Sequence, residues 1–281
     1  MVGRLLATVV CLALPAMIAS CTSVWPPPEA SIRPAAVLGV TDQDVASLEQ
    51  ALTEAVSLEI EGIRFTSGRI AGRPVVVAWT GVGKVNAAMV ATLLIEHFEP
   101  TQVLLTGIAG GVDPNLEPGD IVIARRTAHH DMGYWGPVGM EPGGVRNRLT
   151  EETNPTFFPA DPGLLACAQH AANATKLDPI AHHNGERPPR VVVGTVVTGD
   201  TFVASRTKCQ ELAETLQAGA VDMEAAAVAQ ICHQRSIPHL ALRSIADKAD
   251  QSAVVDKQKF YSLAAQNASR LVIAILKNMG A

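Results

Sequence analysis

Short, continuous hydrophobic runs alternate along the chain with longer stretches in which hydrophobic positions recur every three or four residues. The short runs predict buried strands at 35–40, 74–80, 103–106, 120–124, 190–197, 220–223 and 239–245. The longer stretches predict helices at 85–98, 162–175, 205–216, 224–235 and 257–277, after a first one that runs from Thr41 to Val56. Few strand runs alternate hydrophobic with polar positions, so both faces of the sheet should be covered. The pattern predicts one α/β domain with a largely parallel core sheet.

Two segments depart from this alternation. Residues 60–70 resemble strand with a turn at Ser67-Gly68. Residues 127–159 are rich in Gly, Pro, His and aromatic residues and hold no long predicted element. Because structureless segments of that length inside a domain are usually functional or mobile, residues 127–159 are a candidate pocket or interface segment, with Tyr134 and Trp135 as contact residues.

The first residues read as an export signal rather than as part of the fold. Arg4 is the only charge before Glu29, and an apolar stretch follows it. That stretch is too short to span a bilayer but suits a signal peptide. It ends in Ile18-Ala19-Ser20-Cys21, which looks like the lipobox of bacterial lipoproteins.

The N-terminal pattern therefore predicts a signal peptide over 1–20, a lipid on Cys21, a Pro-rich tether over 21–34 and a domain over 35–281. The protein is expected to be exported and anchored to a membrane through Cys21, facing the periplasm. An ordinary cleaved signal with an incidental cysteine is the alternative.

Composition narrows the possible functions. Hydrophobic residues make up 48% and charged residues 17% of the chain, which excludes a disordered protein. A net charge of −5 argues against a nucleic-acid groove. Cys167, Cys209 and Cys232 match no zinc spacing, and His129-His130-Asp131 has no further ligand at a fixed spacing, so neither a metal nor a cofactor is expected.

The candidate chemistry lies where predicted strands end. In open α/β sheets, ligands bind outside the carboxyl ends of the strands. Gly-rich segments occur there at 81–83 and 107–111, where backbone N–H groups can approach a ligand closely. Lys84, which begins a helix, is expected to be exposed. Four carboxylates share this edge and suggest acid–base work on a polar substrate: Asp44, Glu224, Asp247 and Asp250.

Several of these segments together resemble a known family. The strings are TGVGKVNAAMVATLLIEHFEP, VLLTGIAGGVDPNLEPGDIVIA, VVTGDTFV and AVDMEAAAVAQICHQRSIPHLALRSIADKAD. They are similar to the nucleoside phosphorylase/nucleosidase superfamily, especially its methylthioadenosine/S-adenosylhomocysteine nucleosidases. The resemblance implies a three-layer α/β/α sandwich with a mixed, partly barrel-like central sheet. It also implies a homodimer with the active site near the interface, a small purine nucleoside as substrate, and no metal or cofactor.

The resemblance also assigns roles to residues. Asp247 would be the general acid that protonates N7 of the purine, and Phe202 and Val203 would hold the base. Met223 and Glu224 would hold the ribose.

Three further positions follow from the same resemblance. Asp44 would activate water, where the family normally has glutamate. Arg243 would support the pocket, and Ile108 stands where nucleosidases commonly have serine.

Hydrolysis is favoured over phosphorolysis. Phosphorylases of the family place an arginine just before the Gly-rich turn, a bidentate donor suited to phosphate. Here Leu104-Leu105-Thr106 precede that turn, and Asp42 and Asp44 would repel phosphate. The alternatives are a phosphorylase with another phosphate clamp and a nucleoside-binding lipoprotein without turnover.

Overall fold

The computed structural model describes residues 33–182, 185–251 and 253–279. The predicted signal peptide, Cys21 and most of the tether lie outside the described residues. Within the described part, no helix is both long enough and apolar enough to cross a membrane.

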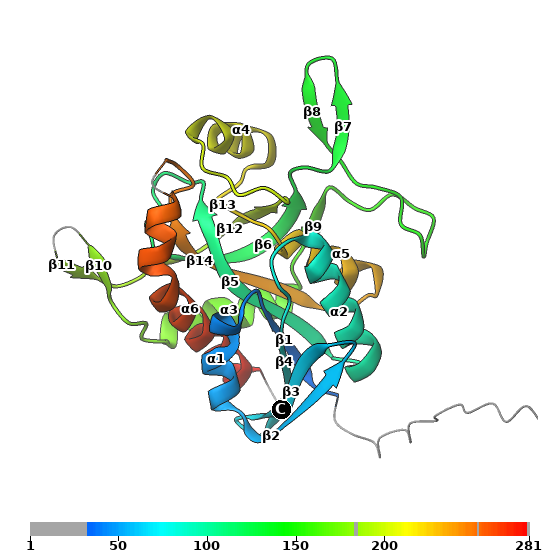
Figure 1. The fold of residues 1–281 in the computed structure, drawn as a ribbon, viewed down its shortest axis with the longest axis vertical. Helices are drawn as coiled ribbons and strands as arrows, with labels where there is room; N and C mark the ends of the chain where they lie inside the picture. Colours follow the sequence, from blue (N-terminus) through cyan, green and yellow to red (C-terminus); the bar gives the residue numbers. More distant parts are fainter. Residues whose placement is uncertain (1–32, 183–184, 252, 280–281) are drawn as a thin grey trace, which may run out of the picture. The chain divides into compact units, whose positions relative to one another are not determined.

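A single large mixed sheet forms the centre of the domain (Figure 1). Its strands follow the path β13-β12-β6-β14-β5-β1-β4-β3-β2. In chain order they are β1 (Ala35–Gly39), β2 (Thr53–Ile60), β3 (Ile63–Ile70), β4 (Arg73–Trp79), β5 (Gln102–Gly111), β6 (Ile121–His129), β12 (Val191–Thr198), β13 (Ala220–Asp222) and β14 (His239–Asp247). The short strand β9 (Phe157–Pro159) pairs with β6.

Half of this sheet closes on itself. Strand β13 pairs in parallel with β12 and antiparallel with β5, while β14 joins β5 to β6. The ring β5-β14-β6-β12-β13 is therefore a small closed barrel, and β1, β4, β3 and β2 extend from it as an open sheet. This arrangement confirms the mixed, partly barrel-like sheet.

Helices cover both faces of the sheet. On one side lie α1 (Asp42–Ala51), α3 (Pro162–Ala174) and α6 (Ala253–Asn278), which share a hydrophobic core with one sheet face. On the other side lie α2 (Lys84–Phe98) and α5 (Ala225–Gln234), with a second core. A third cluster contains α4 (Arg206–Leu216). The three-layer α/β/α architecture is confirmed, and burial of every β1 and β14 residue agrees with the absence of alternation in their sequences.

Some local predictions were wrong. The first helix ends at Ala51, and Val56 lies in the edge strand β2 with 67% of its surface exposed. The chain turns at Glu61-Gly62, while Ser67 and Gly68 lie inside β3. A solvent-exposed edge strand lacks the buried hydrophobic pattern by which a strand is predicted, so the sequence predicts helix as far as Val56 where the structure has β2.

The Gly-rich stretch after Thr106 is also not a turn. Strand β5 continues through it to Gly111 and forms part of the barrel wall. Residues 127–159 contain the end of β6, a hairpin of β7 (Gly133–Gly136) and β8 (Gly139–Pro142), and β9. A second hairpin, β10 (Ile180–His182) with β11 (Gly185–Arg187), lies on the other side of the domain in Figure 1.

Candidate active site

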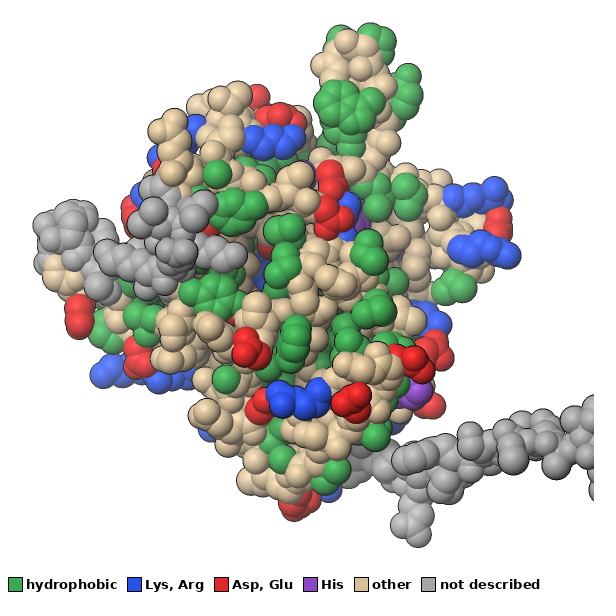
Figure 2. Space-filling view, viewed as in Figure 1, with side chains coloured by type: hydrophobic (Ala, Val, Ile, Leu, Met, Phe, Trp, Pro, Cys, Tyr) green, Lys and Arg blue, Asp and Glu red, His purple; other side chains and the backbone are tan. Residues whose placement is uncertain are grey.

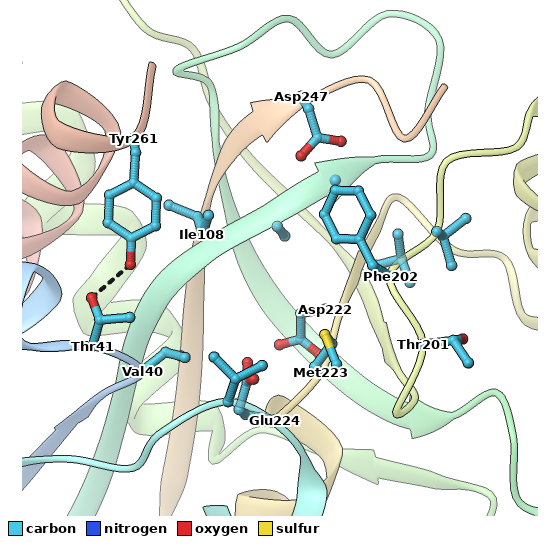
Figure 3. A pocket seen from close by; sticks show the side chains of 15 residues that line it. Val40, Thr41, Ile108, Thr201, Phe202, Asp222, Met223, Glu224, Asp247 and Tyr261 are labelled. Carbon is cyan, nitrogen blue, oxygen red and sulfur yellow. Dashed lines mark hydrogen bonds between the residues drawn. The ribbon is translucent and has the colours of Figure 1, made fainter. Parts of the chain in front are cut away.

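One cavity collects most of the residues singled out in the sequence (Figure 3). It opens where β1, β4, β12, β13 and β14 end, and the glycine-rich half of β5 forms one wall. The lining residues are Val40, Thr41, Val82, Ile108, Ala109, Gly110, Thr201, Phe202, Val203, Val221, Asp222, Met223, Glu224, Asp247 and Tyr261. The barrel thus brings together segments that are far apart in the chain.

Asp247 and Phe202 lie at one end of this cavity (Figure 3). Asp247 is the last residue of β14 and is 2% exposed. Its Oδ1 accepts a hydrogen bond of 2.7 Å from the backbone N–H of Ala249, which fixes the carboxyl group. Phe202, in the segment after β12, is 45% exposed and offers a ring face to a ligand, while Val203 is buried. This end can hold a flat base beside an acid.

The other end is built around Glu224, the N-cap residue just before α5. Its Oε1 accepts a 3.0 Å hydrogen bond from the backbone N–H of Gly83, and its Oε2 lies 3.3 Å from Nη2 of Arg243. Arg243 is fully buried, and its Nε donates to Asp222 at 2.6 Å. Asp222 also accepts from Thr198 Oγ1 at 2.5 Å. Arg243 therefore lies behind the cavity, in contact with Asp222 and Glu224, and does not line it.

Gly107 makes this arrangement possible. A Cβ at this position would lie 2.2 Å from Nη1 of Arg243. Only a residue without a side chain lets the guanidinium pass so close to β5. Gly107 therefore clears space for a buried cation rather than forming a turn.

Glu224 has an unusual proton affinity. Burial raises the pKa of Glu224 to about 7; the charge of Arg243 opposes this shift and the charge of Asp222 adds to it. Asp222 forms the shorter contact with Arg243, so the cation compensates Glu224 only in part. A carboxyl group that titrates near neutral pH can change its charge when a ligand binds.

Asp44 does not line the cavity. It is 1% exposed and lies behind Thr41, in the first turn of α1. Its Oδ2 accepts hydrogen bonds from the backbone N–H groups of Val40 and Thr41, at 3.2 and 2.8 Å. The second of these resembles the bond by which the third residue of a helix reaches back to its cap. The hydroxyl groups of Thr41 and Tyr261 separate Asp44 from the cavity.

Lys84 is not exposed as predicted. Its ammonium group lies 2.6 Å from Asp131 and 4.0 Å from Asp200, and its side chain is 18% exposed. The backbone N–H of Lys84 also donates to Asp200 Oδ1 at 2.7 Å, and the N–H of Asp200 donates to Asp131 at 2.9 Å. These contacts tie together three segments beside the cavity, those that follow β4, β6 and β12. The carboxylates of Asp131 and Asp200 therefore hold the Lys84 side chain against the protein instead of leaving it in solvent.

Sequence reasoning included Asp250, which the structure does not place in the cavity lining; Asp250 pairs with Arg206 at 3.3 Å. It missed the site residues Thr41, Asp222 and Tyr261. Asp222 stands beside Met223 in the quoted motif and could have been found there. Tyr261 reaches the site from the C-terminal helix, with no pattern around it that points to a ligand.

His129 and His130 lie in β6 and just after it, outside the lining of the cavity. No group of three or more His, Cys, Asp or Glu side chains in the described part of the chain could hold a metal ion. His129 and His130 are both buried, and burial lowers the pKa of each. His129 Nε2 pairs with Gln230 at 3.0 Å. These histidines act as packed, neutral side chains.

Comparison with known proteins identifies the class to which this fold and site belong. The profile of the phosphorylase superfamily matches residues 34–277. The chain belongs to the phosphorylase superfamily, as its motifs predicted. Within that superfamily it belongs with the 5′-methylthioadenosine/S-adenosylhomocysteine nucleosidases.

Individual relatives support this placement along nearly their whole length. The nucleosidase of Shewanella piezotolerans is 33% identical over 244 residues, which are 86% of this chain and 98% of the relative. The crystal structure of the nucleosidase from Neisseria meningitidis, in complex with methylthio-immucillin-A, has a TM-score of 0.77 and 32% identity. The match covers 88% of this chain and 100% of that chain. The futalosine hydrolase of Helicobacter pylori has a TM-score of 0.75 and 25% identity, covering 88% of this chain and 99% of that chain.

Proposed function

We propose that this protein hydrolyses the N-glycosidic bond of a purine nucleoside of the 5′-methylthioadenosine or S-adenosylhomocysteine type, releasing the free base and the sugar. The observation that carries the proposal is the layout of the cavity. One carboxyl group, Asp247, lies beside an aromatic ring at one end, and a second buried carboxyl group, Glu224, lies at the other (Figure 3). The proteins to which the chain is similar are named as 5′-methylthioadenosine/S-adenosylhomocysteine nucleosidases, and this name agrees with the proposed reaction.

One end of the cavity binds the base and the other binds the sugar, the two groups that the N-glycosidic bond joins. Cleavage builds positive charge on the sugar and negative charge on the leaving base, as in glycoside hydrolysis. Asp247 donates a proton to N7 of the purine, which stacks on Phe202 and packs on Val203. A general acid of this kind contributes about 10²–10⁴-fold to the rate.

The sugar lies at the opposite end. Glu224 accepts hydrogen bonds from its hydroxyl groups, and Met223 and Ile108 pack against it. Asp44, which does not line the cavity, is the base that finally takes up a proton when water attacks. Arg243 holds Glu224 and Asp222 in place. The carboxylates also stabilise the cationic sugar in the transition state.

Water is the better nucleophile for this cavity. None of its lining residues in the described part of the chain is lysine or arginine. The guanidinium of Arg243 is fully buried and already contacts two carboxylates. The strongest side-chain clamps for phosphate are charged, bidentate donors, and the lining of this cavity offers none.

The proposal is tested by following base release from purified residues 35–281. Methylthioadenosine, S-adenosylhomocysteine, adenosine and inosine are supplied separately, and free base is measured by chromatography. We expect adenine from at least one 5′-modified nucleoside, and a loss of about 10²-fold or more in kcat for Asp247→Asn. Tight binding with no base released from any of the four would instead support the nucleoside-binding reading.

A homodimer is part of the proposal. Large hydrophobic side chains are exposed at the start of α2 and on the β7–β8 hairpin: Val82, Val85, Met89, Tyr134, Trp135 and Val138. Figure 2 shows hydrophobic side chains at the tip of that hairpin. Exposed apolar groups of this size often mark protein contacts. Light scattering should give twice the chain mass, and Val85→Asp should reduce it to one.

The proposal that the protein is exported and anchored to a membrane rests on its N-terminal segment. We expect cleavage before Cys21, a lipid on Cys21 and a periplasm-facing anchor, because a lipobox-like sequence precedes a Pro-rich tether. Full-length protein expressed in a bacterium should partition into the detergent phase of a Triton extract. Cys21→Ala should remain in the aqueous phase; detergent partition unchanged by that substitution would contradict the lipid anchor.

A further inference from the structure

Three oxygen atoms meet at the edge of the cavity. Tyr261 Oη lies 2.6 Å from Thr41 Oγ1 and 3.2 Å from Oδ2 of Asp44, and Thr41 Oγ1 lies 3.1 Å from the same Oδ2. Figure 3 shows the Tyr261 and Thr41 side chains meeting at their hydroxyl groups. Every pair in this triangle is within hydrogen-bond distance.

The carboxylate and the two hydroxyl groups differ in their access to a ligand. Thr41 and Tyr261 line the cavity, whereas Asp44 is 1% exposed and does not. A substrate or water in the cavity therefore meets the hydroxyl groups first. A buried carboxylate that cannot touch the reacting water directly can still act on it through an intervening proton carrier.

The fold fixes this geometry from two elements. Tyr261 belongs to α6, and Asp44 lies 217 residues earlier, on α1. A second contact between the same helices holds the register, because the hydroxyl of the fully buried Ser269 donates to the backbone oxygen of Asp44 at 2.7 Å. The two backbone N–H groups that bind Oδ2 keep the carboxylate facing the hydroxyl groups. The triangle is thus a built arrangement, not a chance surface contact.

We propose that Tyr261, held by Thr41, is the proton carrier between the attacking water and Asp44. As the water oxygen forms its bond to the anomeric carbon, its proton moves to Tyr261 Oη. The proton of Tyr261 passes at the same time to Oδ2 of Asp44. The C–N bond breaks, and its electron pair leaves with the base. This assignment rests on the hydrolysis proposed above and adds to it the route by which water is activated.

The electrostatic setting agrees with that role. Burial, together with the nearby negative charge of Asp44, raises the pKa of Tyr261 above its usual range. The phenol therefore stays protonated at neutral pH and can give up its proton only while it receives another. That is the behaviour required of a carrier, as opposed to a free base.

The test compares single and double variants of the full-length protein on 5′-methylthioadenosine. Tyr261→Phe removes one oxygen and keeps the ring, and we expect kcat to fall by about 10²-fold while KM changes by less than about threefold. Thr41→Val should lower kcat in the same direction. Because Tyr261 acts through Asp44, the Tyr261→Phe/Asp44→Asn double variant should lose no more than Asp44→Asn alone.

A matched control separates the relay from a packing effect. Thr66 on β3 is also buried, and its hydroxyl donates to a carboxylate, Glu49, at 2.9 Å, but it does not line the cavity. Thr66→Val should leave kcat unchanged. Adenine, which has no sugar and needs no water, should bind Tyr261→Phe as tightly as the parent protein.

Three outcomes overturn the relay while the hydrolysis proposal stands. Two are kinetic: an unchanged kcat for Tyr261→Phe, or losses from Tyr261→Phe and Asp44→Asn that multiply. Weakened adenine binding by a folded Tyr261→Phe would also count against it, because it would assign the hydroxyl a binding role. Failure of the hydrolysis proposal itself would look different, since the parent protein would release no base.

Discussion

Oε1 of Glu224 accepts a 3.0 Å hydrogen bond from the backbone N–H of Gly83, which lies 141 residues earlier in the chain. This bond joins the loop after β4 to the residue just before α5. It leaves Glu224 buried between a backbone donor on one side and Arg243 on the other. The position of the Glu224 carboxylate thus depends on a loop that lies far from it in the sequence.

The titration of Glu224 should appear in the pH dependence of activity. Its pKa is raised to about 7, and in the proposed reaction the charged form accepts the sugar hydroxyl groups and stabilises a cationic sugar. We expect kcat/KM to rise with pH and to level off above about pH 7. Glu224→Gln should be slow throughout and should lack this rise. A parent profile that is flat from about pH 5 to about pH 8 would contradict the assignment.

The same shift predicts an effect on stability with a definite sign. A carboxyl group whose pKa is higher in the folded state binds more protons there than in the unfolded chain. Its contribution to the free energy of unfolding is therefore greatest at low pH and declines as pH rises from the ordinary value of 4.5 to about 7. In thermal melts between about pH 5 and about pH 8, Glu224→Gln should show a smaller loss of Tm with rising pH than the parent protein. An equal loss in both would count against the shift.

The Lys84 contacts predict a change in substrate binding. Lys84→Met keeps most of the length of the side chain but removes the charge that bridges Asp131 and Asp200. The segments that carry Val82 and Phe202 should then become less well ordered, and we expect KM to rise by about tenfold, equivalent to about 1.4 kcal/mol, with kcat changed much less. Steady-state kinetics on methylthioadenosine measures both values.

Lys208→Met is the matched control for Lys84. Lys208 forms a 2.6 Å pair with Glu211 within α4, away from the cavity lining. An exposed pair of this kind is worth little, so this variant should behave like the parent protein. Similar KM values for both lysine variants would show that the Lys84 bridge does not organise the cavity.

Gly107 should tolerate no side chain. In Gly107→Ala, the new Cβ would lie 2.2 Å from Nη1 of Arg243, and Arg243 cannot move without losing its contacts to Asp222 and Glu224. We expect a loss of about 1–3 kcal/mol in the free energy of unfolding, as for other overpacked sites. At Gly143 a Cβ would meet nothing within 4 Å, so Gly143→Ala should be close to neutral. Denaturant melts of the two variants compare them directly, and equal stability would contradict the close approach.

The sequence predicted those parts of the fold that rest on strong periodicity. The strands β1 and β4 and the helix α2 lie within a few residues of their expected positions. Continuous hydrophobic runs and amphipathic patterns predict them well, because these patterns follow from which side chains pack in the core. Strand β2 was not predicted because it lies at the edge of the sheet and exposes its hydrophobic residues Val56 and Leu58. The extension of β5 through its Gly-rich end was not predicted. Its glycines form part of the barrel wall and make room for the buried Arg243, and no local sequence pattern indicates either role.

The sequence predicts which carboxylates belong to the candidate site better than it predicts how they are arranged. Glu224 and Asp247 could be placed from strand ends and motifs, and both line the cavity. The position of Asp44 behind Thr41 depends on tertiary contacts from α6, and Tyr261 is brought to it from the far end of the chain. Local sequence patterns carry no information on such long-range contacts.

The most direct test of the central claim is the identity of the sugar product. The domain is incubated with 5′-methylthioadenosine in buffers with and without phosphate, and the sugar is analysed by phosphorus and carbon NMR. The account predicts free methylthioribose and adenine at the same rate in both buffers, since no lysine or arginine among the described residues lines the cavity to hold phosphate. Methylthioribose 1-phosphate, formed only when phosphate is present, would contradict it.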